Sequence, residues 1–228
     1  MTNWRKPILQ LSVFLAAFFV LWTLRATVFF SIDESIASPT ARATYSNLLK
    51  FVLWVLSAAA FAYWLRNASP TKYLGVSVFP RSRTWLSCLA VTAIFLMAVT
   101  LLDLTVGRKS FSGAGLSSLA TAVGLQQFLV SPLFEELLFR GLVMKELLLF
   151  LPAYLASALT SLLFLGVHIP FWLSHGGLTQ AMLANAFGVF VFSLVACWLY
   201  ARSASIWPPT FAHVANNILS SLLVAGSA

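Results

Sequence analysis

The chain has 228 residues, of which 60% are hydrophobic and only 9% charged, and it contains 20 phenylalanines and 8 tryptophans. Together with a mean hydropathy of +0.91, this composition excludes an ordinary soluble globular domain. The formal net charge of +8 comes from basic residues scattered between apolar segments, which favours anionic lipid headgroups over nucleic acid as their partners.

Seven apolar segments follow one another along the chain, and a helix needs about 20 such residues to cross a bilayer. The segments lack the strict alternation that a transmembrane β-barrel strand would show. We therefore predict an all-α fold, a polytopic helical membrane bundle with seven or eight transmembrane segments. The predicted segments are 8–30, 45–65, 85–106, 116–150, 153–173, 178–201 and 206–225.

The basic residues of the first half predict how the bundle is oriented. Arg5 and Lys6 precede the first segment, which we interpret as a retained helix, and Arg25 near its end is expected to reach the membrane interface. The loop 66–84 contains four Lys or Arg residues, whereas the loop 31–44 contains one. By the positive-inside rule, the N-terminus and loop 66–84 are predicted to be cytoplasmic and loop 31–44 to lie outside.

The segment 116–150 is too long for one simple crossing, because a continuous helix of this length would measure about 52 Å. Pro132 lies in its middle and disfavours helical geometry at Ser131. We therefore expect one crossing up to about residue 131 and a second helix from about residue 132. This ambiguity leaves the count at seven or eight and the side of the C-terminus open.

The most unusual feature of the chain lies in this same segment, where Glu135, Glu136 and Arg140 occur among apolar residues. An ionised residue at the centre of a membrane helix costs roughly 2.5–3.5 kcal/mol on insertion scales, and such residues usually have a function. On a helix, Glu136 and Arg140 are four positions apart and can form an ion pair. Glu135 points about 100° away, so Arg140 does not hold it, and its carboxylate is a candidate general base. The alternative is a buried ion pair that only locks helix packing.

Two later segments contain further polar residues that favour an active site. His168 ends an apolar helix just before Pro170, and His213 and Asn217 lie one helical turn apart on one face of the last segment. Ionisable residues within membrane segments normally face the bundle interior or a wet cavity. We therefore expect Glu135, His168, His213 and Asn217 to converge on an enclosed polar pocket.

These motifs resemble the CPBP family of intramembrane proteases, which includes CAAX prenyl protease 2, the Abi proteins and bacteriocin-processing enzymes. The family pattern is Glu-Glu-x-x-x-Arg, then Phe-x-x-x-His, then His-x-x-x-Asn, and the chain carries all three in order over roughly residues 115–225. The resemblance implies a catalytic membrane core at 115–228, preceded by variable transmembrane helices at 1–114. It also implies a hydrolase of the cytoplasmic membrane of a prokaryote.

The resemblance further implies an intramembrane endopeptidase in which Glu135 activates water. His168 would assist that water, and His213 and Asn217 would bind the oxyanion, for which an amide and an imidazole N–H are suited. The ion pair of Glu136 and Arg140 would position the base. No cofactor is firmly predicted. Zinc or another divalent metal held by Glu135, His168 and His213 is the alternative, although the chain has no His-Glu-x-x-His motif.

Two other functions remain open from the residues alone. One is a proton-coupled membrane transporter that uses the same side chains as a proton relay, although no inverted repeat is recognisable. The other is a non-catalytic immunity or scaffold protein of the same fold. For a protease, the expected partners are the lipid bilayer and a membrane-associated or exported protein or peptide, with no nucleic acid. The oligomeric state is not indicated.

Overall fold

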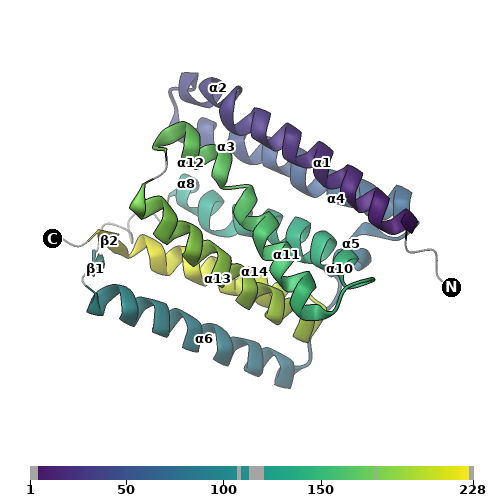
Figure 1. Ribbon diagram of the computed structural model, residues 1–228. Coiled ribbons are helices and arrows are strands. Elements are labelled where there is room, and N and C mark those ends of the chain that lie inside the picture. Colours follow the sequence, from purple (N-terminus) through teal and green to yellow (C-terminus); the bar gives the residue numbers. More distant parts are fainter. Residues whose placement is uncertain (1–4, 107–108, 113–120, 178, 226–228) are drawn as a thin grey trace.

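The long helices of the structure run side by side and alternate in direction along one axis (Figure 1). This computed structural model describes residues 5–106, 109–112, 121–177 and 179–225. Its elements are α1 (Arg5–Thr27), α2 (Phe30–Ser35), α3 (Pro39–Lys50), η1 (Phe51–Leu56), α4 (Ser57–Ala60), η2 (Phe61–Leu65), α5 (Pro70–Tyr73), α6 (Ser82–Thr105), β1 (Lys109–Phe111), α8 (Ala122–Leu125), η3 (Gln126–Val130), α9 (Ser131–Glu136), η4 (Leu137–Met144), α10 (Lys145–Leu147), α11 (Ala153–Gly166), α12 (Ile169–His175), α13 (Gln180–Ser203), α14 (Trp207–Ser221) and β2 (Leu223–Ala225). Apart from the short antiparallel pair of β1 and β2, the described part of the chain folds into helices and their connections, so the predicted helical fold is confirmed.

Five helical runs in the described residues are long and apolar enough to cross a membrane. They are Arg5–Ser35, Pro39–Leu65, Ser82–Thr105, Ala153–Ser174 and Met182–Ser203. Large apolar side chains remain exposed on their outer faces, for example Leu86 and Phe187, as expected for surfaces in contact with lipid. The chain is therefore a multi-pass membrane bundle, and the count of seven or eight crossings stays a prediction.

Residues 122–147 form one uninterrupted helical run, so the predicted break at Pro132 is wrong. Ser131, just before the proline, has helical dihedral angles of −61° and −48°. Pro132 lies two residues after the end of the π-helical turn η3, and the run contains a second π-helical stretch, η4. Local π adjustments accommodate a proline in membrane helices by giving new partners to the backbone groups that it frees. The polar motif therefore lies on one continuous helix.

The second half of this run occupies the interior of the bundle, whereas its first half still exposes Leu125 and Leu129. Every residue of η4 is buried, and the buried core around it includes Trp54, Phe139 and Phe164. The last helix, α14, also points buried residues inward, among them Thr210 and His213. The glutamate motif and His213 therefore lie in the interior of the bundle, and His168 lies on one of the five apolar runs, Ala153–Ser174.

One end of the bundle, which we call the basic end, contains the start of α1 and the connections 66–81, 148–152 and 204–206. Lys145 Nζ donates to the carbonyl of Tyr73 at 2.6 Å, and Ser205 Oγ donates to the carbonyl of Val78 at 2.6 Å. These bonds tie the connections together. The Lys and Arg residues of the basic end are Arg5, Lys6, Arg66, Lys72, Arg81, Arg83, Lys145 and Arg202.

Glu146 fixes the end of the helical run 122–147 at the basic end. Arg66 binds it through Nε at 2.8 Å and Nη2 at 2.5 Å, and the Tyr73 hydroxyl donates to the same carboxylate. Burial, followed by this bond to Glu146, raises the pKa of the Tyr73 phenol well above its usual range. Nearby, Gly141 lies so close to the chain at Leu74 that a Cβ there would come within 2.7 Å of the Leu74 carbonyl oxygen. Connection 66–81 therefore fixes the position of the helix that carries the motif.

Candidate active site

Glu135 is paired with Lys50, a residue from a different helix. Lys50 ends α3, and its Nζ lies 2.5 Å from Glu135 Oε1 and 2.5 Å from Ser131 Oγ. Ser131, one turn before Glu135 on α9, donates to the same Oε1 at 3.2 Å. The second carboxylate oxygen, Oε2, makes neither of these contacts. Lys50 and Ser131 thus hold one oxygen of Glu135 and leave the other available.

Glu136 and Arg140 form the predicted ion pair. Arg140 Nη1 donates to Glu136 Oε1 at 3.0 Å, and both side chains are fully buried. The other guanidinium nitrogen, Nη2, donates to the Ser193 hydroxyl at 2.7 Å and to its carbonyl at 3.1 Å. The guanidinium also lies over the Phe164 ring, 4.6 Å from its centroid. Arg140 therefore connects the helix of the glutamates to α13 and α11.

His213 joins the two glutamates from α14. Its Nδ1 lies 2.8 Å from Glu136 Oε1, and its Nε2 lies 3.8 Å from Glu135 Oε2. Since an ionised carboxylate only accepts hydrogen bonds, Nδ1 carries the hydrogen of this bond. A neutral ring has no second N–H, so only a doubly protonated His213 can donate from Nε2. The prediction that an imidazole N–H binds an oxyanion therefore requires the charged ring.

His168 lies at the junction of α11 and α12, with its ring between those of Phe164 and Trp172. Its Nδ1 donates to the Phe164 carbonyl at 2.9 Å, which leaves Nε2 as a hydrogen-bond acceptor in the neutral ring. The turn between the two helices, with Pro170 in the first turn of α12, turns this ring toward the pocket described next.

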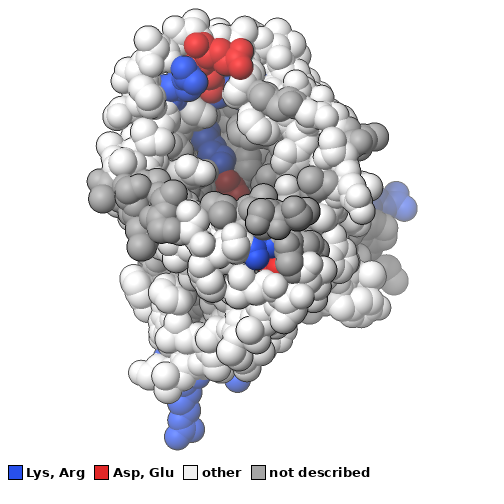
Figure 2. Space-filling model, turned by 90° about the vertical axis from the view of Figure 1, so that its left-hand side faces the viewer, with Lys and Arg blue, Asp and Glu red and all other residues white. Residues whose placement is uncertain are grey.

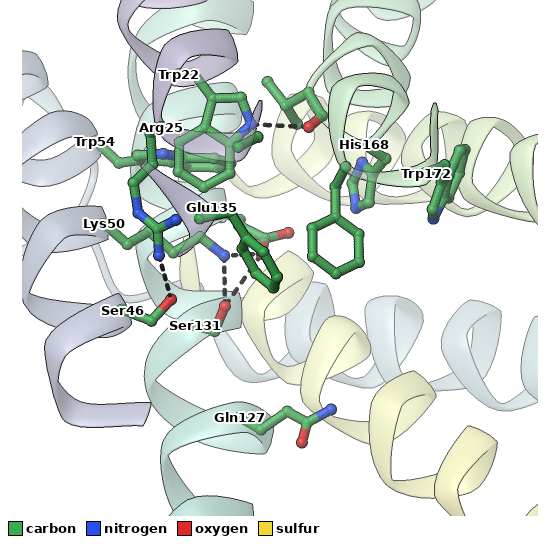
Figure 3. Close-up of a pocket in the computed structure, with 14 residues that line it drawn as sticks. Trp22, Arg25, Ser46, Lys50, Trp54, Gln127, Ser131, Glu135, His168 and Trp172 are labelled. Carbon is green, nitrogen blue, oxygen red and sulfur yellow. Dashed lines mark hydrogen bonds and ion pairs between the residues drawn. The ribbon is translucent and has the colours of Figure 1, made fainter. Parts of the chain in front are cut away.

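A pocket of about 490 Å³ contains Glu135 and His168 in its wall. Lys50, Ser131 and Glu135 come together on one side of it, and His168 and Trp172 lie on the other (Figure 3). Elsewhere the wall is mostly apolar and includes four further aromatic side chains. It is completed by Trp22, Arg25, Ala26, Phe30, Ser46, Trp54, Gln127, Val167 and Phe171. A pocket with an apolar wall and a few converging polar groups is typical of ligand or substrate sites.

Arg25 is buried inside the bundle, and its position relative to the membrane interface stays a prediction. Its guanidinium is buried, binds the Asp33 carboxylate and donates to Ser46 Oγ at 3.2 Å. The short helix α2 returns Asp33 toward α1, and this gives the buried charge a partner within the bundle. Arg25 thereby becomes part of the pocket wall.

The predicted convergence of the polar residues holds in part. The structure brings Glu135, Glu136, Arg140 and His213 into contact, and His168 shares the pocket of Glu135. Asn217 is half-buried one turn after His213 on α14, which packs against η3 and α9. Neither Asn217 nor His213 is part of the pocket wall, so only Glu135 and His168 of the four predicted residues line it.

Residues 117–219 match the family model described as type II CAAX prenyl endopeptidase Rce1-like. This segment of the chain is therefore similar to the type II CAAX prenyl endopeptidases. The match confirms the resemblance to the CPBP family and covers all three sequence motifs, from Glu135 to Asn217. No curated protein and no solved structure is found to match the chain.

Three polar contacts of the site were not predicted, and one of them comes from outside the Rce1-like segment. Ser131 and Ser193 lie within that segment, whereas Lys50 precedes it by many residues. A signal for Lys50 existed, because it is the one charged residue of the predicted segment 45–65. The same cost of an intramembrane charge that marked the glutamates applies to it.

The alternative of a metal at Glu135, His168 and His213 does not fit the donor set. Within the described ranges, no three His, Cys, Asp or Glu side chains are placed to hold one metal ion. The Lys50 ammonium lies against Glu135, and His213 Nδ1 is bonded to Glu136. A divalent cation at Glu135 would lie beside that ammonium, and like charges repel. We therefore derive no step through a metal.

Proposed function

We propose that the chain is an intramembrane endopeptidase of the CAAX-protease type, which hydrolyses a peptide bond in a membrane-associated or exported protein or peptide. The observation that carries this proposal is the Glu135 carboxylate, held through Oε1 and with Oε2 near His213, in the wall of a pocket that also contains His168. A held carboxylate near one imidazole and across the pocket from a second is an arrangement suited to general acid–base catalysis.

In this proposal, Glu135 Oε2 takes a proton from a water molecule whose other hydrogen points to His168 Nε2. The hydroxide attacks the carbonyl carbon of the substrate, and the oxyanion is bound by protonated His213 and by the amide of Asn217. Glu135 then gives its proton to the leaving nitrogen as the carbon–nitrogen bond breaks. Water thus supplies OH to one product and H to the other.

Glu136 and Arg140 act in this proposal through His213. The carboxylate of Glu136 accepts the hydrogen of His213 Nδ1, so it stabilises the positive charge that the ring needs for donating from Nε2. Arg140 in turn keeps Glu136 paired in a fully buried place. These two are positioning residues, and Glu135, His168, His213 and Asn217 are the residues that meet substrate or water.

The test of this function is to identify the protein termini created by cleavage in membranes. Membranes that contain the wild-type chain are compared with membranes that contain the Glu135→Gln variant. We expect peptide termini that are present with the wild type and absent with the variant at equal protein levels. Wild-type membranes without any Glu135-dependent terminus would contradict the proposed protease. A proton-coupled flux into vesicles that the same substitution abolishes would favour the transporter instead.

Lys50 offers a sharper test of the geometry. Lys50→Met leaves Oε1 of Glu135 without its cation, so the carboxylate is no longer held in place, and we expect kcat to fall about 10²-fold. Lys50→Arg keeps the charge and should restore most of the loss. Lys50→Cys treated with 2-bromoethylamine rebuilds an ammonium at nearly the same length and should also recover activity.

The matched control for Lys50 is Lys72→Met, which removes an exposed lysine of α5 far from the pocket and should leave kcat unchanged. All variants are compared at equal thermal stability of the folded protein. A Lys50→Met enzyme with wild-type kcat, or an arginine variant no better than methionine, would show that Lys50 does not position the base.

A further inference from the structure

The pocket lies toward one end of the bundle, opposite the basic end. Its wall comes from the last turns of α1, from α3 and η1, from the first half of the 122–147 run and from the junction of α11 with α12. All of these parts lie on the side where α2 and the strand pair β1–β2 are found (Figure 1). We call this side the pocket end.

The pocket opens at that end. The view onto the pocket end shows a deep hollow in the surface, with basic and acidic atoms at its bottom (Figure 2). The charged residues in the pocket wall are Arg25, Lys50 and Glu135. Glu135 is thirteen positions after the start of α8, which places its Cα about 20 Å along the helix from that start. A substrate that reaches Glu135 from this mouth must therefore extend into the bundle by several residues.

The two ends of the bundle carry different charge. The basic end contains eight Lys and Arg residues and a single acidic residue, Glu146. Outside the pocket wall, the described basic residues of the pocket end are Arg42 and Lys109, and the acidic ones are Asp33, Glu34 and Asp103. The sequence between α6 and β1 adds one more basic residue, Arg108. An excess of Lys and Arg in short loops sets the cytoplasmic side of a membrane protein. This asymmetry makes the basic end the cytoplasmic one.

We propose that the active site opens to the side of the membrane away from the cytoplasm and acts on exported polypeptides. The substrate class that fits is a membrane-anchored chain already translocated, with an extended segment of about six residues reaching from the outer surface, given about 3.3 Å per residue. The five Trp and Phe side chains in the pocket wall receive its apolar side chains. This inference names the substrate side of the proposed protease and rests on that function.

Cysteine labelling in intact cells tests the side directly, without reference to catalysis. Single cysteines are placed in a background with Cys88→Ala and Cys197→Ala, at Thr40→Cys near the start of α3 and at Thr71→Cys in α5. Both positions are exposed, one at each end. With a membrane-impermeant maleimide we expect Thr40→Cys to react in intact cells and Thr71→Cys to react only after permeabilisation.

A third variant, Gln127→Cys, reports on the pocket itself, because Gln127 is exposed and lies in its wall. It should label from outside like Thr40→Cys. The reverse pattern, or labelling of both ends in intact cells, would overturn the inference even if the chain proves to be a protease. Conversely, the expected labelling pattern could be found while no peptide terminus depends on Glu135. That result would contradict the proposed protease function and would still support the proposed orientation. Where termini are found, they should map to segments outside the cytoplasm.

Discussion

Glu135→Gln is expected to lower the rate of substrate cleavage by about 10²- to 10⁴-fold, the usual contribution of a general base. The amide has nearly the shape of the carboxylate and can still accept from Lys50, so the fold should be retained. Oε2 would be replaced by an amide group that cannot take a proton. The measurement is the single-turnover rate at which a wild-type-dependent terminus appears in membranes.

A second substitution at this position separates chemistry from packing. Glu135→Asp keeps the acid but draws it back by one methylene group, away from His213, and a displacement of about 1 Å can cost 10²-fold in rate. We expect measurable activity that exceeds that of the glutamine variant. Equal rates for the wild type and Glu135→Gln, at equal thermal stability, would rule out Glu135 as the base.

Arg140→Met is expected to produce the largest loss of stability in the protein. It leaves Glu136 as a fully buried carboxylate without its cation, and breaking such a pair typically costs about 3–5 kcal/mol. The Ser193 hydroxyl and carbonyl also lose their donor. The free energy of unfolding in detergent micelles, measured by denaturant titration, is the test.

The double variant Glu136→Gln/Arg140→Met distinguishes an unpaired charge from lost packing. It removes both charges, so much of the stability should return, whereas activity should stay low because His213 has lost its carboxylate partner. Arg42→Met is the matched control, since Arg42 is exposed and donates to the Ile36 carbonyl, and it should cost under about 1 kcal/mol. An Arg140→Met protein as stable as this control would contradict the role of the buried pair.

Local features of the sequence predicted the local parts of this site. The ion pair of Glu136 and Arg140 follows from a spacing of four on one helix, and the apolar segments followed from their length and hydropathy. Both inferences need only residues close together in the chain. Other contacts of the site join residues that are far apart in the sequence. Glu136 and His213 are 77 positions apart, and Lys50 and Glu135 are 85 positions apart. No periodicity tells which helix packs against which, so these contacts could not be derived.

Pro132 illustrates a second limit. The rule that proline disfavours helix at the preceding residue holds for α-helical winding, and it predicted two helices where the structure has one. The π-helical turn η3 just before the proline changes that winding. Nothing in residues 126–130 marks such a turn in the sequence. In the structure, η3 packs against α3 and α14, and Gln126 hydrogen-bonds to Asn47 and Thr44 of α3, contacts that a local pattern does not predict.

The pairing of buried charges has a consequence for the electrical behaviour of the protein. Five of the six acidic residues form ion pairs with a Lys or Arg: Asp33, Asp103, Glu135, Glu136 and Glu146. A charge that crosses the membrane feels about 2.3 kcal/mol per 100 mV, but a close pair of opposite charges feels almost no net force. These paired charges therefore contribute little to the response of the folded bundle to the membrane potential. A voltage-dependent step could then arise when substrate or a proton enters the pocket.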